Sequence, residues 1–168
     1  MRHPTLHSVF LFLGFFNHHL TSANEPKPSI LWITAEDMSP VLGCYGDTDA
    51  ITPNIDKLAR ESIKYTHAFA SAPVCSPSRS CLIQGALPPS MGTQHMRSGF
   101  PLPSVFNGFP SLLRKAGYYT TNNVKTDYNS GNYREIIEKS WNESSSTAHW
   151  RKRTTEMIPF FSVFNLMT

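Results

Sequence analysis

The sequence lacks long runs of like charge. Only 16% of its 168 residues are charged, the formal net charge is +3, and the longest basic run is the triplet 151–153. Proteins that bind nucleic acid gather lysine and arginine on one face or along one helix. A basic triplet is more typical of an ordinary solvated surface. We therefore expect no nucleic-acid partner.

The sequence also lacks an apolar run long enough to cross a bilayer, which takes about 20 residues. The apolar run near the N-terminus covers only residues 9–16, after Arg2 and before the small residues 21–23. A charged start, a short apolar segment and a small-residue cleavage site are typical of a secretory signal peptide. We expect residues 1–23 to be a signal peptide cleaved near Ala23. We also expect no stable membrane insertion, and a secreted or periplasmic mature protein.

Cysteine is scarce, with three residues in the chain. Three is too few for the disulfide framework of a small secreted scaffold, and an odd number leaves one thiol without a partner. Pairing of Cys44 with Cys81 would leave Cys75 free, although the sequence does not fix that pairing. A free cysteine in an exported protein is a liability unless it is used or modified. This favours a chemical role for Cys75.

Apolar residues are numerous enough for a core. They make up 40% of the chain, with 11 Phe and 3 Trp, which indicates a globular domain rather than disorder. Apolar runs and helical spacing of apolar residues predict an α/β protein. The expected strands cover residues 29–35, 63–70, 118–124 and 158–166. The expected helices cover residues 52–62, 77–84, 110–116 and 132–141. The first strand is expected at the centre of a sheet with both faces buried, and helix 52–62 is expected to pack its apolar stripe on the core.

A short helix is predicted just after Cys75. Ser76 is a good N-cap residue, Pro77 is a good first helical residue, and Gly85 ends the helix. Cys75 would then lie at the positive end of the helix, with the Arg79 cation on about the same face. Such an arrangement suits a reactive side chain beside an anionic substrate. The alternative is a small buried cysteine beside ordinary capping residues.

Two carboxylates, Glu36 and Asp37, directly follow the first expected strand. Open α/β sheets bind ligands at the carboxyl ends of their strands. Adjacent acids repel each other unless a cation lies between them, so the pair indicates a divalent metal bound through oxygen. The alternative is an ordinary acidic turn.

Lys125 and Asp127 follow the expected strand 118–124. His95 and Arg97 belong to a long loop rich in proline and glycine and are candidates for contact with an anionic substrate. We expect this loop to return near the mouth of the site. For each of these residues the alternative is ordinary surface charge.

Two motifs resemble signatures of the type I sulfatases. The first motif reads Cys-x-Pro-Ser-Arg with a later Leu and Gly, and six residues match it: Cys75, Pro77, Ser78, Arg79, Leu82 and Gly85. The second motif reads Gly-Tyr-x-Thr, four residues and Lys-x-His, and four residues match it: Gly117, Tyr118, Thr120 and Lys125. Two positions depart from the family pattern. Glu36 stands at the first of two metal-binding aspartates, and Asp127 stands where the family has histidine.

The resemblance implies an alkaline-phosphatase-like α/β fold, with a mostly parallel central sheet flanked by helices. It implies that a formylglycine-generating enzyme oxidises Cys75 to formylglycine, whose hydrated form attacks sulfur. Sulfate would be released from a sulfated small molecule or, more specifically, a glycan. Ca²⁺, with Mg²⁺ as the alternative, would be held by Glu36, Asp37 and the modified Cys75. Arg79 and Lys125 would neutralise the sulfate oxygens, and Asp127, at the histidine position, would be a candidate contact to the substrate.

The resemblance covers residues 29–168 and matches only the first part of a family member. Residues 24–168 are therefore expected to be the N-terminal part of a sulfatase catalytic domain, with a fold that is incomplete in this chain. One alternative is a phosphate or phosphonate ester hydrolase of the same superfamily, because either tetrahedral anion suits the charges. The other alternative is an inactive truncated fragment that at most binds anions or metal. Comparing sulfate release with phosphate release distinguishes a sulfatase from a phosphate or phosphonate ester hydrolase. Calcium binding without turnover would favour the inactive fragment.

Overall fold

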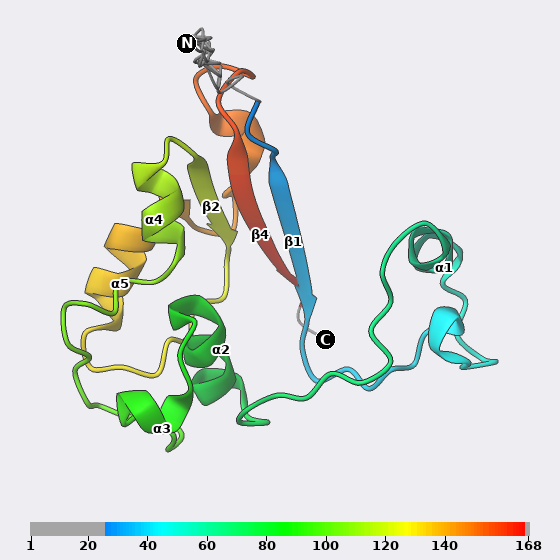
Figure 1. Ribbon diagram of the computed structural model, residues 1–168, viewed down its shortest axis with the longest axis horizontal. Helices are drawn as coiled ribbons and strands as arrows, with labels where there is room; N and C mark the ends of the chain where they lie inside the picture. Colours follow the sequence, from blue (N-terminus) through cyan, green and yellow to red (C-terminus); the bar gives the residue numbers. More distant parts are fainter. Residues whose placement is uncertain (1–25, 167–168) are drawn as a thin grey trace, which may run out of the picture.

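The computed structural model describes residues 26–166, which form an α/β structure around a four-stranded parallel sheet (Figure 1). The strand order is β1-β4-β2-β3, and the strands are β1 Ile30–Ala35, β2 Tyr119–Asn123, β3 Glu143–Ser144 and β4 Phe160–Leu166. The α-helices are α1 Pro53–Arg60, α2 Cys75–Gln84, α3 Pro88–Met91, α4 Pro110–Lys115 and α5 Tyr133–Ser140. Two short 3₁₀ helices complete the elements: η1 Gly43–Tyr45 and η2 Trp150–Lys152. The predicted fold class is confirmed.

The core lies between one face of the sheet and the helices α2, α4 and α5 (Figure 1). Its centre is Phe161 of β4, which is 2% exposed. Three aromatic rings surround Phe161, with centroid distances of 6.0 Å to Trp32, 5.2 Å to Phe109 and 5.8 Å to Trp141. Large aromatic side chains bury the most apolar area per residue, so this cluster supplies much of the stabilisation of the sheet.

The opposite face of the sheet is covered only in part. Trp150 of η2 stacks on Phe160 at 5.3 Å and meets the edge of Phe164 at 5.5 Å, so η2 covers β4. Strand β1 lies at the edge of the sheet, where Leu31 is 48% exposed and Ile33 is 58% exposed. The prediction of a central β1 buried on both faces is therefore wrong. An apolar run indicates that the side chains of a strand favour burial, but it does not determine whether the strand lies at the centre or at the edge of the sheet.

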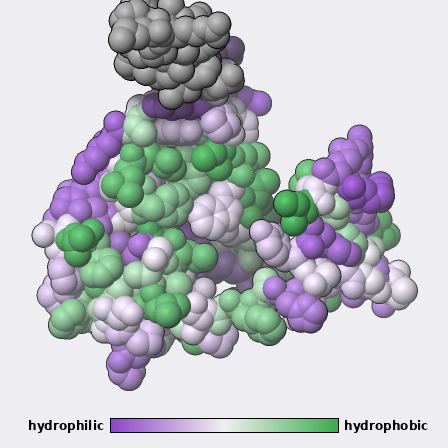
Figure 2. All heavy atoms as spheres, in the orientation of Figure 1, coloured by the Kyte–Doolittle hydropathy of each residue, from purple (hydrophilic) through white to green (hydrophobic). Residues whose placement is uncertain are grey.

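Helix α1 forms where it was predicted, yet its apolar stripe does not reach the core. Ile55 is 46% exposed and Leu58 is 64% exposed, and Figure 1 shows α1 on an arm apart from the sheet. The helix packs on η1, where the Asp56 carboxylate accepts hydrogen bonds from the Cys44 backbone N–H at 2.7 Å and from the Thr52 hydroxyl at 3.0 Å. Hydrophobic side chains are accordingly visible on the surface of this arm in Figure 2.

One smaller expectation is also corrected. Residues 63–70 form no strand and are irregular, with Phe69 89% exposed. The sequence leaves the pairing of Cys44 with Cys81 open; in the structure all three cysteines lie in the described part of the chain and are free thiols. The other predicted strands and helices are confirmed to within a few residues as β1, β2, β4, α2, α4 and α5.

Among residues 26–166, no helix has the length and hydropathy needed to span a bilayer. The predicted signal peptide lies outside the described residues.

His149 makes the cover of β4 sensitive to pH. Its ring lies against Trp150 with a centroid distance of 3.9 Å, and its Nδ1 accepts a hydrogen bond from the Arg151 backbone N–H at 3.1 Å. Burial lowers the pKa of His149, and the nearby Arg151 and Lys152 cations lower it further. The neutral imidazole is thus the form that fits the folded structure.

We expect the free energy of unfolding to rise as pH rises through the window between this lowered pKa and the ordinary value near 6.5. In that window the unfolded chain binds more protons than the folded one, so raising the pH favours the folded state. Urea unfolding at a series of pH values between 5 and 8 measures this slope. The His149→Phe variant keeps a ring but cannot titrate, so its slope should be smaller. An equal slope in both chains would contradict the assignment.

Candidate functional site

The candidate site begins at the first turn of α2. The helix starts at Cys75 itself, and its N-cap is Val74, with φ −142° and ψ 140°. The sequence predicts Ser76 as the N-cap, but Ser76 is buried within the first turn of the helix. The predicted end of the helix is confirmed, because Gly85 has the left-handed φ of 65° that favours glycine. Cys75 is therefore half-buried at the positive end of a ten-residue helix.

A surface hollow brings Cys75 together with the two carboxylates that follow β1. Its lining includes residues 34–39, residues 73–75 and Arg79 of α2. Strand β1 runs parallel to β2 and β4, so the carboxyl ends of all three lie at one edge of the sheet. The sequence-predicted residues Glu36, Asp37, Cys75 and Arg79 thus share one hollow, as the strand-end reasoning predicts.

Glu36 binds two cations at once. Its Oε1 lies 3.1 Å from Nη1 of Arg79, and its Oε2 pairs closely with Nζ of Lys125. The three side chains are only 12–23% exposed. Charge pairs that are shielded from water in this way interact more strongly than exposed ones. Glu36 therefore gathers the two sequence-predicted cations into one cluster beside Cys75.

Arg79 is held on several sides by hydrogen bonds. Its Nε donates to the Thr126 carbonyl at 2.8 Å, and its Nη2 donates to the Asn165 Oδ1 at 3.0 Å and to the Lys125 carbonyl. With the bond to Glu36, four of the five guanidinium N–H groups are engaged. The planar fork of arginine suits this set of fixed acceptors, which a lysine could not match.

Lys125 is kept as a cation by its neighbours. The hydrogen bond to Glu36 raises the pKa of Lys125, and the negative potential of Glu36, Cys75 and Asp127 raises it further, although partial burial opposes the rise. Cys75 and Asp127 therefore both lie within electrostatic reach of the Lys125 ammonium group. Lys125 therefore carries its positive charge throughout the pH range in which proteins normally work.

Replacing Glu36 by glutamine is expected to lower the pKa of Lys125, because the amide keeps the shape of the side chain but removes its negative charge. The measurement is an NMR titration of the Lys125 ammonium and its Cε at alkaline pH. The matched control is Glu135→Gln, which breaks the Glu135–Lys139 ion pair on α5. An unchanged Lys125 pKa in Glu36→Gln, or an equal fall in the control, would show that Glu36 does not set the charge of Lys125.

Two carboxylates of the site have the chemistry that a hard divalent cation prefers. Asp37 is exposed at the hollow, and its main chain adopts φ 53° directly after Glu36. Both side chains offer oxygen donors, as Ca²⁺ and Mg²⁺ require. Among the described residues, however, no group of three or more His, Cys, Asp or Glu is placed to hold a metal. The donor type therefore fits a metal, and residues 26–166 supply a partial ligand set.

The remaining sequence-predicted residues do not line the hollow that holds Cys75. Asp127 is half-buried with φ 45° in the segment after Lys125. His95 and Arg97 are exposed in the loop after α3, and neither lines the hollow that holds Cys75. The buried Asn129 fixes this loop, since its side chain bonds to the main chain of residues 93, 95 and 98. The loop therefore returns beside α2 without bringing either side chain into the cluster.

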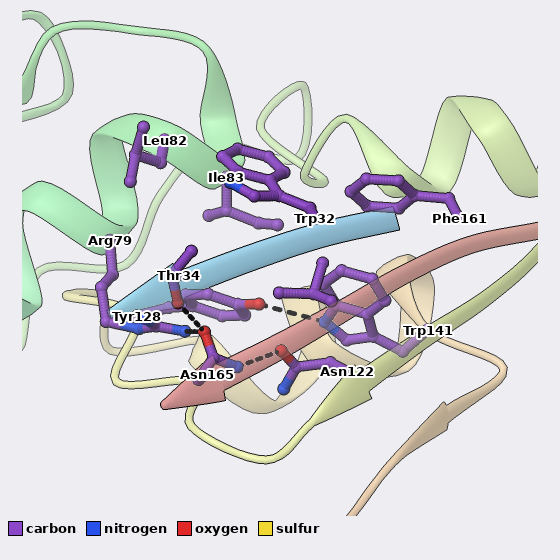
Figure 3. A pocket seen from close by; sticks show the side chains of 11 residues that line it. Trp32, Thr34, Arg79, Leu82, Ile83, Asn122, Tyr128, Trp141, Phe161 and Asn165 are labelled. Atoms are coloured by element: carbon purple, nitrogen blue, oxygen red, sulfur yellow. Dashed lines mark hydrogen bonds between the residues drawn. The ribbon is translucent and has the colours of Figure 1, made fainter. Parts of the chain in front are cut away.

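Sequence reasoning missed a set of uncharged polar residues at the same sheet edge (Figure 3). Asn165, near the end of β4, accepts a hydrogen bond from the Thr34 hydroxyl at 2.9 Å and donates to the Asn122 Oδ1 at 3.0 Å. The rule that singled out Glu36, a polar side chain at the carboxyl end of a strand, applies to these residues too. Because these residues are uncharged, the charge pattern of the sequence does not indicate them.

An apolar pocket lies behind Arg79, between α2 and the sheet (Figure 3). Trp32, Ile83 and Phe161 form part of its lining, together with the buried Tyr128. The Tyr128 hydroxyl accepts a hydrogen bond from Nε1 of Trp141 at 3.0 Å, and burial raises the pKa of Tyr128 to about 12. The guanidinium of Arg79 therefore borders an apolar region of low dielectric constant, which strengthens its electrostatic interactions.

Comparison with known proteins identifies the family. The sulfatase family model matches residues 28–159. An ulvan-active sulfatase from Formosa agariphila is 40% identical over 151 residues, which cover 83% of this chain and 24% of that protein. The chain spans about a sixth to a quarter of the length of the curated relatives it matches.

Solved structures support the fold. One is a protein in complex with its substrate D-glucosamine-2-N,6-O-disulfate, with a TM-score of 0.66 and 19% identity over 83% of this chain and 34% of that chain. Another is the phosphonate monoester hydrolase of Agrobacterium radiobacter, with a TM-score of 0.55 and 26% identity over 71% of this chain and 25% of that chain. These likenesses concern the fold. The family model matches most of the described residues, and the chain therefore belongs to the sulfatase family.

Proposed function

We propose that this chain is part of the catalytic domain of a sulfuric ester hydrolase that releases sulfate through a residue derived from Cys75. The observation that carries the proposal is the convergence of Arg79 and Lys125 on Glu36, at the edge of the hollow that Cys75 lines. Two cations and a helix N-terminus at one point suit an anion with several oxygens.

Arg79 and Lys125 are the groups that would bind and orient the sulfate ester. Arg79 contributes a fixed positive charge and the one N–H group that its four protein hydrogen bonds leave over, whereas Lys125 contributes a compact charge whose protonation its neighbours maintain. Because hydrogen bonds hold Arg79 before substrate arrives, its stabilisation of the developing charge costs little reorganisation. Asp127 lies close enough to Lys125 to influence its charge and takes the place of the histidine expected from the family pattern.

Cys75 is the residue that would be converted to formylglycine by the formylglycine-generating enzyme. The hydrated aldehyde of formylglycine supplies a nucleophilic hydroxyl where the thiol now lies. The half-buried position at the first turn of α2 fits this group, since the side chain faces a hollow lined by residues that follow β1. Such a hydroxyl would lie at the positive end of the helix dipole, which favours its ionised form.

A divalent cation, Ca²⁺ or alternatively Mg²⁺, would be held by Asp37 and Glu36 with the modified Cys75. It would supply further positive charge for the sulfate oxygens. Glu36 has both carboxylate oxygens engaged by Arg79 and Lys125, so Asp37 is the freer of the two ligands within the described residues.

The proposed substrate is a sulfated glycan. Support comes from the relative named as an ulvan-active sulfatase and from the structure solved with a disulfated glucosamine. We further propose that the protein is secreted or periplasmic, as the N-terminal sequence pattern predicts, and that residues 24–168 are the N-terminal part of the catalytic domain. Export would place the enzyme where polymeric glycans are found.

The deciding experiment is peptide mass spectrometry of Cys75 in protein produced with a formylglycine-generating enzyme, together with an assay of sulfate release. We expect the mass of the peptide with residue 75 to show formylglycine, and we expect release from a sulfated oligosaccharide. An unmodified cysteine, or modified protein that releases no sulfate from any sulfated sugar or aryl sulfate, would overturn the proposal.

One observation favours a second candidate, a phosphate or phosphonate ester hydrolase of the same superfamily. The chain is similar in structure to a phosphonate monoester hydrolase. Assays with matched aryl sulfate, aryl phosphate and aryl phosphonate esters separate the two candidates. A higher kcat/KM for sulfate supports the first proposal, and a higher value for either phosphorus ester supports the second.

A further inference from the structure

Asn165 links four separate parts of the candidate site (Figure 3). It lies in β4, opposite Thr34 of β1 in the sheet register. Its Oδ1 accepts hydrogen bonds from the Thr34 hydroxyl at 2.9 Å and from Nη2 of Arg79 at 3.0 Å. Its Nδ2 faces the Asn122 Oδ1 at 3.0 Å and the carbonyls of Asn123 at 3.1 Å and Lys125 at 3.3 Å. One amide thus contacts two strands, α2 and the segment that carries Lys125.

The oxygen and the nitrogen of the Asn165 amide face hydrogen-bonding groups of complementary type. All groups facing Oδ1 are donors, and all groups facing Nδ2 are acceptors. An amide carries both functions on one rigid plane, which a hydroxyl, a carboxylate or an apolar side chain does not. The surroundings therefore fix the orientation of the amide and specify asparagine rather than a residue of similar size.

The bonds of Asn165 converge on the groups that place Arg79. Nη2 of Arg79 donates both to Asn165 and to the Lys125 carbonyl, and that same carbonyl accepts from Asn165. The three groups form a closed triangle at the carboxyl edge of the sheet. Rotation of the guanidinium would break its bonds to both other members, so the triangle restrains Arg79 in one orientation.

We propose that Asn165 is a positioning residue that holds the Arg79 guanidinium and the main chain of Lys125 in the arrangement needed to bind a sulfate ester. This inference deepens the function proposed above and rests on it. Asn165 acts through Arg79, so its loss should affect binding and turnover of an anionic ester without removing any charge from the site.

The key variant is Asn165→Asp, which keeps the shape of the side chain. Its second carboxylate oxygen would face the Asn122 Oδ1 and two carbonyls, which repel it. The control is Ser162→Ala. Ser162 is on the same strand and fully buried, and it bonds to Thr121 rather than to the Arg79 cluster. Thr34→Val is a milder variant that removes only the donor to Oδ1.

The experiment measures kcat and KM for sulfate release in the full-length protein that contains this chain. We expect kcat/KM to fall about tenfold to a hundredfold in Asn165→Asp, as for partners that orient a functional group, and to fall less in Thr34→Val. Ser162→Ala should lose stability without such a fall. Equal kcat/KM in wild type and Asn165→Asp would overturn the proposal, as would equal losses in Asn165→Asp and Ser162→Ala.

A second readout does not depend on activity. In protein labelled with ¹⁵N-arginine, we expect a resolved, slowly exchanging Arg79 Nε–H signal in wild type and in Ser162→Ala, and its broadening or loss in Asn165→Asp. The signal is assigned from its absence in Arg79→Lys. If wild type releases no sulfate but the Arg79 signal depends on Asn165, the proposed function fails and the positioning role stands. If the signal is the same in wild type and Asn165→Asp, the positioning role fails.

Discussion

If the proposed nucleophile derives from Cys75, replacing Cys75 by alanine is expected to reduce sulfate release by about a thousandfold or more, since removal of a nucleophile leaves only the catalysis that binding and charge stabilisation provide. Alanine has no atom that can become an aldehyde hydrate. It is also the best helix former and fits the first turn of α2, so the fold should be little changed. Sulfate release and urea unfolding of both proteins measure the two effects separately.

The matched control is Cys81→Ala on the same helix. Cys81 is half-buried like Cys75, but it does not line the hollow that holds Glu36 and Arg79. We expect Cys81→Ala to release sulfate at close to the wild-type rate. Substantial sulfate release by Cys75→Ala, or equal losses in the two variants, would show that the side chain of residue 75 is not the source of the nucleophile.

The parts of the fold that the sequence predicts well are those set by local pattern. Strand β4 and helix α5 have apolar residues at the spacing their structure needs, and both formed within a few residues of the prediction. The contact of Glu36 with Lys125 could be predicted in part, because polar residues at the ends of parallel strands meet at one edge. The pairing of both cations with one carboxylate could not be predicted, since it depends on side-chain orientation.

The failures share one physical cause. An apolar stripe on α1 indicates that one face of the helix favours burial, but it does not determine which surface the face packs against. In the structure Leu58 of this stripe is 64% exposed. The apolar residues of β1 were likewise assigned two buried faces, whereas the strand lies at the sheet edge. Uncharged polar residues such as Asn165 and Asn129 form their networks through long-range contacts, which have no local sequence signal.

The structure predicts a large loss of stability and activity when Arg79 is changed. In Arg79→Met, the carbonyl of Thr126 and the Oδ1 of Asn165 each lose a donor, and Glu36 keeps only Lys125 as a charged partner. Removing one member of a well-shielded ion pair typically costs about 3 kcal/mol or more, because the other charge is left poorly compensated. Loss of one preorganised donor to a developing anion typically costs about a hundredfold to a thousandfold in rate.

The Arg79→Lys variant separates charge from geometry. Lysine keeps the positive charge near Glu36, but its single ammonium group cannot reach the Thr126 carbonyl, the Lys125 carbonyl and Asn165 together. We therefore expect the free energy of unfolding of Arg79→Lys to lie between those of wild type and Arg79→Met, with kcat/KM close to that of Arg79→Met. Urea unfolding and sulfate release measure both quantities.

The control for the Arg79 variants is Arg151→Met, since Arg151 is exposed on η2 and lies over the Trp150 ring without an ion pair in the described residues. Its free energy of unfolding should change by no more than about 0.5–1 kcal/mol, and its sulfate release should not change. Full activity in Arg79→Lys would mean that charge alone is required at this position. In that case the fixed orientation that Asn165 and the Lys125 carbonyl give to the guanidinium would have no catalytic value, and the site would act only by attracting the anion.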